Sequence, residues 1–499
     1  MERRTFFRST MAAAVAASVP RRAFAGFRWT ANQDPTDLLA VRGDGTKVTL
    51  RGSALKELRK NLRGRLLLAS SEGYEQARQV LNPSIDKRPA LIVQATGVAD
   101  LRTAVAFARE NSLLVAVKCG GHSFSGQSTC DSGMMIDLSP FRAVRVDPVA
   151  KRAWVAGGTL LGLVDHEALS HGLVTTMGTV SHTGVGGLTT GGGFGRLARK
   201  FGLAVDNLMS VDVVTADGSL RHASADENPD LFWGVRGGGG NFGIVTSFEF
   251  RLHSMSRQVV GGDLIFPFSK AHDVLSFYAD YSLKAPDELY LDYGMVRPPG
   301  GVDGVVTLSV CYCGPESGAA RALEPLRKLG TPLADGIKTM DYADLQRSGD
   351  VSDPRALGTY LKSGFTTRIS PELITAIVKG FDAHPARATL LFTQHCGGAI
   401  SRVAPEAAAF AHRDAQHNLL TAVAWKVGDD SAPHMRWARQ YWATLEPFTT
   451  GWYTNEVADE SAAAINANYR QNYKRLVAVK SKYDPTNLFR LNANVKPAG

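Results

Sequence analysis

The sequence of 499 residues has few cysteines, no apolar run long enough to cross a membrane and no dense basic tract. A membrane-spanning helix needs about 20 apolar residues, and no segment supplies them. Lys and Arg do not form a stripe interleaved with aromatic residues, which argues against nucleic-acid binding. No Gly is followed by Lys and Ser/Thr at P-loop spacing, so a P-loop is excluded.

The five cysteines are Cys119, Cys130, Cys311, Cys313 and Cys396. Because their number is odd, at least one lacks an intramolecular partner. Their spacing is no zinc pattern, and no metal site is predicted. Cys119 and Cys130 are a possible disulfide in an oxidising compartment, but the sequence does not decide whether they pair.

The length predicts two or three domains, and 44% hydrophobic with 21% charged residues is typical of a soluble globular protein. Part of the formal charge of +9 comes from the first 25 residues, which hold five arginines and one acid. These residues join a basic start to a short Ala-rich stretch ending in "AFA", a cleavage pattern before Gly26. "RRTFFR" resembles a twin-arginine signal. We expect folded export to the periplasm or the medium without a membrane anchor; a disordered basic tail is the alternative.

Regular elements alternate with glycine clusters between residues 88 and 258. "ALIVQA" and "LLVAV" read as buried strands around a helix with Val98, Leu101, Val105 and Ala108 at helical spacing. "VDVVTADGSLRHAS" predicts a hairpin at Asp217-Gly218, and "IVTSFEFRLHSM" alternates like a half-buried strand. After about residue 258 the glycine clusters largely vanish, and mixed strands and helices predict a separate α+β unit.

Three glycine clusters, at 120–126, 184–195 and 237–243, join the predicted elements. Glycine permits positive φ and close approach to a ligand, and successive backbone amides form an anion nest. A flexible linker would not be punctuated by Leu188, Phe194, Leu197 and Phe242. The Gly-x-Gly-x-x-Gly spacing that begins at Gly184 is a weak signal by itself. The clusters therefore predict a large phosphate-bearing cofactor.

Longer motifs give a specific resemblance. "VKCGGHSFSG", "TGVGGLTTGGGFGRLARKFGLAVDN", "DLFWGVRGGGGNFGIVTSFEF" and "NYKRLVAVKSKYDPTNLFRLNANVKP" are similar, in this order, to segments of berberine bridge enzyme and glucooligosaccharide oxidase relatives. The resemblance covers roughly residues 55–498. It implies an α+β fold with a two-part FAD-binding domain of the vanillyl-alcohol-oxidase type and an inserted α+β substrate domain. The expected division is a leader (1–25), an N-terminal segment (26–84), an FAD-binding domain (85–257), a substrate domain (258–450) and a C-terminal segment (451–499).

The resemblance also implies how FAD is held. The histidine that matches His122 forms a covalent bond to the 8α carbon of FAD, which makes the flavin a stronger oxidant and prevents its loss outside the cell. Val180 stands where doubly linked relatives have a cysteine, so a single link is expected. The other implied FAD contacts are Lys118, Cys119, Gly120, Gly121, Ser123, Thr183, Gly184, Gly187, Gly191, Gly193, Asn241, Gly243, Val245, Asn492 and Asn494.

The expected catalytic set has three residues, two of which are candidates for the base. Many relatives carry Tyr-x-Asn-Tyr, whose second tyrosine takes the substrate's hydroxyl proton; the match here is "YTNE", which places Glu456 at that position. A partly desolvated carboxylate can act as a base if its pKa is raised, and a solvated loop acid is an equal alternative. Tyr453 is a flavin or substrate contact within the catalytic set. His395 in "QHCGGAI" is a reserve base or a core histidine.

The resemblance predicts an FAD-dependent oxidoreductase. A small-molecule substrate, a carbohydrate or a secondary metabolite, would pass hydride to the flavin, with oxygen or another acceptor as the final oxidant. Three alternatives remain: a nicotinamide-dependent flavin reductase, for which no second nucleotide loop is evident; a secreted flavin-binding protein without turnover; and a protein that binds no flavin. Substrate and oligomeric state cannot be derived from the motifs.

Overall fold

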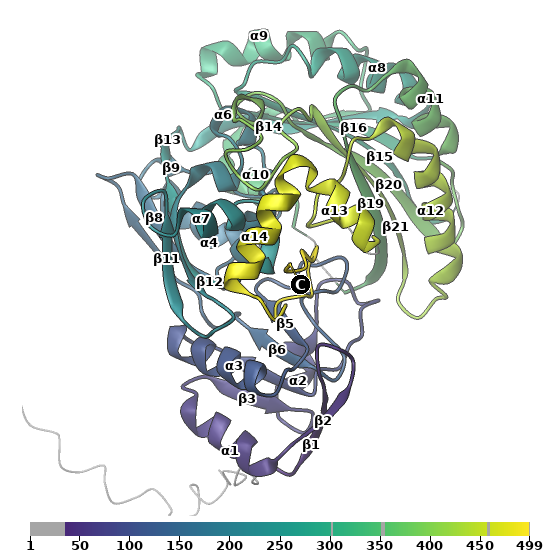
Figure 1. Ribbon diagram of the computed structural model, residues 1–499. Helices are drawn as coiled ribbons and strands as arrows, with labels where there is room; N and C mark the ends of the chain where they lie inside the picture. Colours follow the sequence, from purple (N-terminus) through teal and green to yellow (C-terminus); the bar gives the residue numbers. More distant parts are fainter. Residues whose placement is uncertain (1–34, 301–302, 351–354, 457–459, 499) are drawn as a thin grey trace, which may run out of the picture.

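The computed structural model describes residues 35–300, 303–350, 355–456 and 460–498, and the predicted leader lies outside them. Figure 1 shows two smaller sheets in the N-terminal half and one large sheet in the C-terminal half, with the last helices of the chain lying between the two halves. Two β-ribbons complete the strands: β1 (Leu38–Val41) with β2 (Lys47–Leu50), and β9 (Leu173–Val174) with β13 (His253–Ser254).

The first sheet has four strands in the order β3-β4-β6-β5. Their bounds are Arg65–Leu68 (β3), Leu91–Gln94 (β4), Val115–Lys118 (β5) and Met134–Asp137 (β6). Strands β4 and β5 both pair with β6 in parallel. Parallel strands need a long connection, and helix α3 (Val98–Glu110) supplies the one between β4 and β5. Leu101, Ala104, Val105 and Ala108 form its buried face, which confirms the helix predicted from spacing. Helices α1 (Gly52–Asn61) and α2 (Tyr74–Arg78) belong to the same region.

The second sheet has five antiparallel strands in the order β11-β10-β12-β8-β7. Their bounds are Val144–Asp147 (β7), Arg152–Ala156 (β8), Leu208–Val214 (β10), Leu220–Ser224 (β11) and Ile244–Arg251 (β12). The predicted hairpin joins β10 to β11, with Gly218 at φ +81° and the Asp217 carboxylate accepting from Ser219 N at 3.0 Å. The second glycine cluster follows α4 (Leu161–Leu169), contains α5 (Val185–Gly191) and leads to α6 (Ala198–Phe201). The third cluster follows α7 (Pro229–Val235) and leads into β12.

The third sheet has eight strands, whose main order is β17-β14-β16-β15-β20-β21-β19 with β18 also on β14. Their bounds are Gln258–Pro267 (β14), Leu289–Arg297 (β15), Val305–Tyr312 (β16), Ala334–Asp335 (β17), Lys338–Asp341 (β18), Leu357–Thr366 (β19), Arg387–His395 (β20) and His417–Lys426 (β21). Helices α8 (Ala271–Tyr281), α11 (Pro371–Gly380) and α12 (Ala432–Leu445) cover its outer face (Figure 1). The opposite face carries polar side chains, among them Gln394 and Asn418, beside a small apolar cluster that includes Leu361 and Leu420. Helices α9 (Glu316–Arg327) and α10 (Tyr342–Arg347) complete this unit.

The C-terminal segment returns to the N-terminal half through α13 (Ala462–Asn468) and α14 (Tyr473–Tyr483). Lys480 is fully buried, and its ammonium group donates to Asp484 at 2.7 Å, to Asn241 O at 2.8 Å and to Phe489 O at 2.9 Å. The Asp484 carboxylate in turn accepts from Leu488 N and Phe489 N. This ion pair therefore joins the end of the chain to the third glycine cluster. Within the described ranges no helix is long and apolar enough to span a bilayer.

We expect Lys480→Met to lower the free energy of unfolding by about 3–5 kcal/mol, because the substitution leaves the Asp484 carboxylate buried without its cation. Lys482→Met is the matched control, since Lys482 is exposed and its ion pair with Asp230 contributes at most about 1 kcal/mol. Chemical denaturation of both variants measures the difference. Equal unfolding midpoints for the two variants would contradict the role of the buried pair.

Candidate active site

His122 lies in the loop that follows β5 and contacts the second glycine cluster. Its Nε2 is 2.6 Å from His182 Nδ1, and its Nδ1 is 3.2 Å from the Thr183 hydroxyl. Burial, with the neighbouring His182, lowers the pKa of His122 to about 4. The ring is therefore neutral near pH 7, and one ring nitrogen retains a lone pair.

The two glycine clusters meet backbone to backbone beside this histidine. A Cβ added to Gly120 would lie 2.3 Å from Gly184 N, and one added to Gly184 would lie 2.3 Å from Gly120 N. Any side chain at either position would force the two loops apart. Gly121 has φ +70° and also requires glycine or a strained backbone.

A cavity of about 340 Å³ opens at this junction. Its lining includes Lys118, Cys119, Gly120, His122, Ser139, Arg142, Leu160 and His182, together with residues 79–81 and Arg355. Two guanidinium groups, a neutral imidazole and glycine backbone suit an elongated ligand with negatively charged groups. The cavity has the size expected of a cofactor site.

Three predicted FAD contacts in this loop have partners of their own. The Lys118 ammonium donates to Ala77 O and lies 3.6 Å from Asp137, so it is held inside the domain. Cys119 is a free thiol whose pKa burial raises to about 11, and Cys130 is also free, so no disulfide joins them. The Ser123 hydroxyl accepts from Gln127 N at 3.0 Å and shapes the turn.

The later predicted contacts lie along the second glycine cluster. Gly187 O and Leu188 O both accept from the Asn455 amide, and a Cβ on Gly191 would meet that same side chain at 2.3 Å. Gly193, at φ +85°, donates its N–H to the Tyr453 hydroxyl at 3.0 Å. This cluster is thus packed against the "YTNE" segment.

The third glycine cluster is tied to the chain's end. The Asn241 amide donates to Gly238 O and Ala493 O, and its oxygen accepts from Val495 N. Gly243, at φ +152°, directly precedes β12, and buried Val245 lies within it; a Cβ on Gly243 would lie 2.5 Å from Val214 O. Asn492 O accepts from Gln127 at 3.3 Å, which brings the tail to the His122 loop.

These residues fit a flavin dinucleotide. Among the residues that the structure describes, buried side-chain oxygens of Thr189, Asn492 and Asn494 have no hydrogen-bond partner. Buried polar atoms are ordinarily satisfied, so unpartnered oxygens within a glycine cluster and on the tail that contacts the glycine clusters indicate a polar ligand. The neutral His122 beside that cavity has the chemistry that a covalent link needs.

Glu456 belongs to a second polar cluster, on the face of the large sheet opposite its helices. Its carboxylate is 8% exposed and accepts from the Asn418 amide at 2.9 Å; the same amide donates to Gln394 Oε1 at 2.9 Å. Burial raises the pKa of Glu456 to about 7, and the hydrogen bond from Asn418 offsets only part of that effect. A carboxyl with a pKa near 7 can accept a proton at neutral pH.

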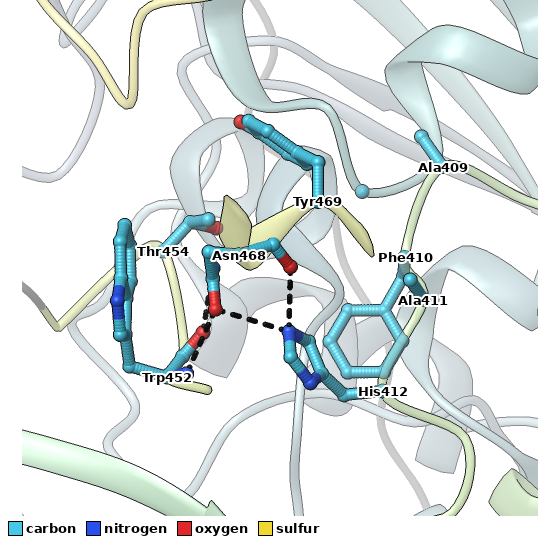
Figure 2. Close-up of a pocket in the computed structure, with 9 residues that line it drawn as sticks. Ala409, Phe410, Ala411, His412, Trp452, Thr454, Asn468 and Tyr469 are labelled. Atoms are coloured by element: carbon cyan, nitrogen blue, oxygen red, sulfur yellow. Dashed lines mark hydrogen bonds between the residues drawn. The ribbon is translucent and has the colours of Figure 1, made fainter. Parts of the chain in front are cut away.

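Asn468 holds Trp452, at the start of the segment that leads to Glu456; Figure 2 shows Asn468 with Trp452 and His412. Asn468 accepts from Trp452 N at 2.9 Å and donates to Trp452 O at 3.0 Å, while His412 Nε2 donates to Asn468 O at 2.9 Å. The cavity between these residues is about 10 Å³, the size of one water molecule. This cavity is too small for a substrate. The hydrogen bonds around it position residues 452–456.

Tyr453 is buried and contacts the glycine loop. Its hydroxyl accepts from Gly193 N and from the Asn455 amide, and its ring packs edge-on against Phe194 at 5.0 Å. Burial raises the pKa of Tyr453 above its ordinary value. Its hydroxyl is therefore protonated and already hydrogen-bonded to Gly193 and Asn455, so Tyr453 supports the site and is not a proton acceptor.

The structure favours one of the two interpretations of His395, the core histidine. It is adjacent to Gln394 in β20, so its side chain lies on the other face of the sheet. Its Nε2 donates to Ser282 O at 2.9 Å, and its Nδ1 accepts from Leu291 N at 3.2 Å. With both ring nitrogens engaged and the ring 1% exposed, His395 is a core histidine.

Three residues that were not predicted belong to these clusters. His182 contacts His122, and Asn418 contacts Glu456. Asp292 lies in β15 two residues before Gly294, and Gly294 pairs with Phe392 of β20. Gln394 lies two residues after Phe392 on the antiparallel strand, so Asp292 and Gln394 share one face of the sheet. Burial raises the pKa of Asp292 to about 7. Strand alternation could have indicated Asn418, but no local signal joins His182 to His122.

Comparison with known proteins agrees with this geometry. Residues 89–224 match the family model of an FAD-binding domain, and residues 453–496 match the model described as berberine and berberine like. An FAD-linked oxidoreductase of Dictyostelium discoideum is 31% identical over 448 residues, covering 89% of this chain and 97% of its own. Xylooligosaccharide oxidase of Thermothelomyces thermophilus is 30% identical over 477 residues, covering 89% and 95%.

A solved structure gives the same fold. The 6-hydroxy-D-nicotine oxidase of Arthrobacter nicotinovorans superposes with a TM-score of 0.81 at 28% identity, covering 88% of this chain and 98% of that one. The predicted α+β fold of the vanillyl-alcohol-oxidase type, with its inserted substrate domain, is confirmed. The chain is a member of the berberine bridge enzyme-like family of FAD-linked oxidoreductases.

Proposed function

We propose that this oxidoreductase oxidises a hydroxyl-bearing small molecule, with Glu456 as the base that takes the hydroxyl proton. The observation that carries the proposal is a buried carboxyl whose pKa is raised to about 7 and whose oxygen is held by Asn418. When bound, FAD supplies the acceptor for the hydride. Glu456 supplies the proton acceptor, and Asn418 with Gln394 orients it.

The cofactor is held covalently through His122 in this proposal. A neutral ring beside the glycine junction supports it, because only an unprotonated nitrogen can form the bond. Val180 carries no sulfur, so the link is single. The remaining hold comes from the glycine clusters and from Asn492 and Asn494, whose side-chain oxygens lack a partner within the described part of the chain.

The substrate class follows from the face around Glu456. Gln394 and the Asn418 side-chain oxygen, which has no partner among the described residues, offer hydrogen-bonding groups, and the partly exposed Phe392 of the same face offers apolar contact. Related proteins are named xylooligosaccharide oxidase, chitooligosaccharide oxidase and (R)-6-hydroxynicotine oxidase. A carbohydrate or a hydroxylated secondary metabolite fits such a face, and dioxygen is the proposed final acceptor.

Export of the folded protein is part of the proposal. A covalent cofactor would survive transport and dilution outside the cytoplasm, which agrees with a twin-arginine-like leader before Gly26. We expect the mature protein in the periplasm or the medium to begin at Gly26. N-terminal sequencing checks this, and a cytoplasmic protein that keeps residues 1–25 would contradict it.

The experiment that tests the function follows the flavin absorbance of the purified protein without oxygen. Oligosaccharides and hydroxylated secondary metabolites are added in turn, and air is then readmitted. We expect bleaching with at least one compound, followed by recovery of the colour and formation of hydrogen peroxide. Bleaching by a nicotinamide dinucleotide alone would indicate a reductase. A yellow protein that no compound bleaches would indicate a binding protein without turnover.

A further inference from the structure

The rings of His122 and His182 are in direct contact. The two nitrogens are 2.6 Å apart, and the ring centroids are 4.7 Å apart with planes inclined by 44°. Both rings line the 340 Å³ cavity. His182 is distant from His122 in sequence, and neither glycine pattern predicts a partner for the histidine.

The proton on His122 can be placed from its two contacts. A neutral imidazole carries one N–H, so it donates in one contact and accepts in the other. One arrangement that satisfies both contacts has the Thr183 hydroxyl donating to Nδ1 at 3.2 Å and the hydrogen on Nε2, and the proposed attachment uses this arrangement. His122 Nε2 then donates to His182 Nδ1, and the lone pair of His122 resides on Nδ1.

His182 is held in place from both sides of its backbone. Ser181 O accepts from Gly162 N at 2.8 Å, and Thr183 O accepts from Leu161 N at 2.9 Å. Asp350 accepts from both the Ser181 N–H and the Ser181 hydroxyl. These bonds fix the backbone on both sides of His182, and the contact with His122 Nε2 orients its ring.

We propose that His182 is a positioning residue for covalent attachment of the flavin: it orients His122 and takes up the Nε2 proton as Nδ1 forms its bond. This inference rests on the proposed link through His122. It assigns the chain its own means of attachment, a pair of histidines, one in the first glycine cluster and one just before the second.

The attachment step balances with dioxygen as the oxidant. One C–H bond of the 8α methyl group and the N–H bond of His122 are lost, and one C–N bond forms. The two electrons and the two protons leave as hydrogen peroxide. Without an acceptor at Nε2, His122 would have to become an imidazolium in a buried site as the bond forms, which desolvation disfavours.

The test measures the rate at which the full-length chain, prepared under flavin limitation, acquires FAD that stays with the acid-precipitated protein. We expect His182→Ala to slow incorporation about a hundredfold, the range typical of a lost proton acceptor, with total FAD binding unchanged. Added imidazole should restore the rate in proportion to its concentration. His182→Asn should stay slow, because an amide can accept the hydrogen bond but not the proton.

His171→Ala is the control for the loss of a histidine, because His171 is exposed. Incorporation by His182→Ala at the wild-type rate would overturn the inference and leave the covalent link intact. Full-rate incorporation by His182→Asn would also overturn it, and the Asn variant still decides the matter if the Ala variant fails to fold. A wild-type protein that binds FAD only reversibly would instead refute the link through His122.

Discussion

Replacement of His122 by alanine will leave the acid-precipitated protein colourless, although the folded variant still binds FAD. The glycine junction and the tail asparagines do not depend on the His122 side chain, so reversible binding persists. We expect the covalent fraction to fall to none, because the other nucleophiles of the cavity lining do not replace His122: Cys119 is a neutral thiol with a pKa near 11, Lys118 is paired with Asp137, and His182 stands behind His122 in the proposed attachment.

The measurement is an absorbance spectrum before and after acid precipitation, with flavin fluorescence of the pellet on a denaturing gel. The variant should also be a weaker oxidant, since each 30 mV or so of lost reduction potential weakens a two-electron oxidation about tenfold. His182→Ala gives the useful comparison, because it should form the same link slowly and reach the same final spectrum. Flavin that remains with the precipitated His122→Ala protein would place the attachment elsewhere.

Much of the N-terminal half could be predicted from local pattern. The strand before "CGGHSFSG", the helix with apolar residues at positions 98, 101, 105 and 108, and the Asp217-Gly218 hairpin were all readable because spacing alone specifies them. The change of composition near residue 258 coincides with the start of β14. Glycine density indicated a cofactor because close backbone approach leaves a sequence trace.

The contacts that complete the site leave no such trace. His122 and His182 come from different loops, and Glu456 meets Asn418 only after the C-terminal segment has returned to the large sheet. His395 shows the limit of motif reading, since a shift of one residue in a strand moves a side chain to the opposite face. Gln394 faces Asn418, whereas His395 is buried beneath it against α8.

Replacement of Glu456 by glutamine should lower kcat by about 10²–10⁴-fold, the range for loss of a general base. Glutamine keeps the size of the side chain and an oxygen that accepts from Asn418, so the change is confined to the proton acceptor. In the wild type the rate should rise with pH through about 7, because only the ionised carboxyl accepts the hydroxyl proton. In Glu456→Gln that dependence should disappear together with most of the rate.

Asp292 is the alternative source of a titration near pH 7, because burial raises its pKa to the same value. The two carboxyls can be told apart by which substitution abolishes the pH dependence. Glu446→Gln is the control for loss of a carboxylate, since Glu446 is exposed. A Glu456→Gln variant that keeps both its rate and its pH dependence would transfer the role of base to Asp292.

The same substitution should make the folded protein more stable above pH 7. The pKa of Glu456 rises from 4.5 to about 7 on folding, so between these values the unfolded chain releases a proton that the folded chain retains. Stability therefore falls as the pH rises through this window, and above it the ionised carboxyl costs roughly 3 kcal/mol. Glutamine has no charge to bury, so Glu456→Gln should unfold at higher denaturant concentration than the wild type at pH 8 but not at pH 4. If Glu456→Gln raises stability at pH 8 and lowers turnover, Glu456 is retained for catalysis at a cost in stability. If Glu456→Gln lowers stability at pH 8, the role of Glu456 is structural.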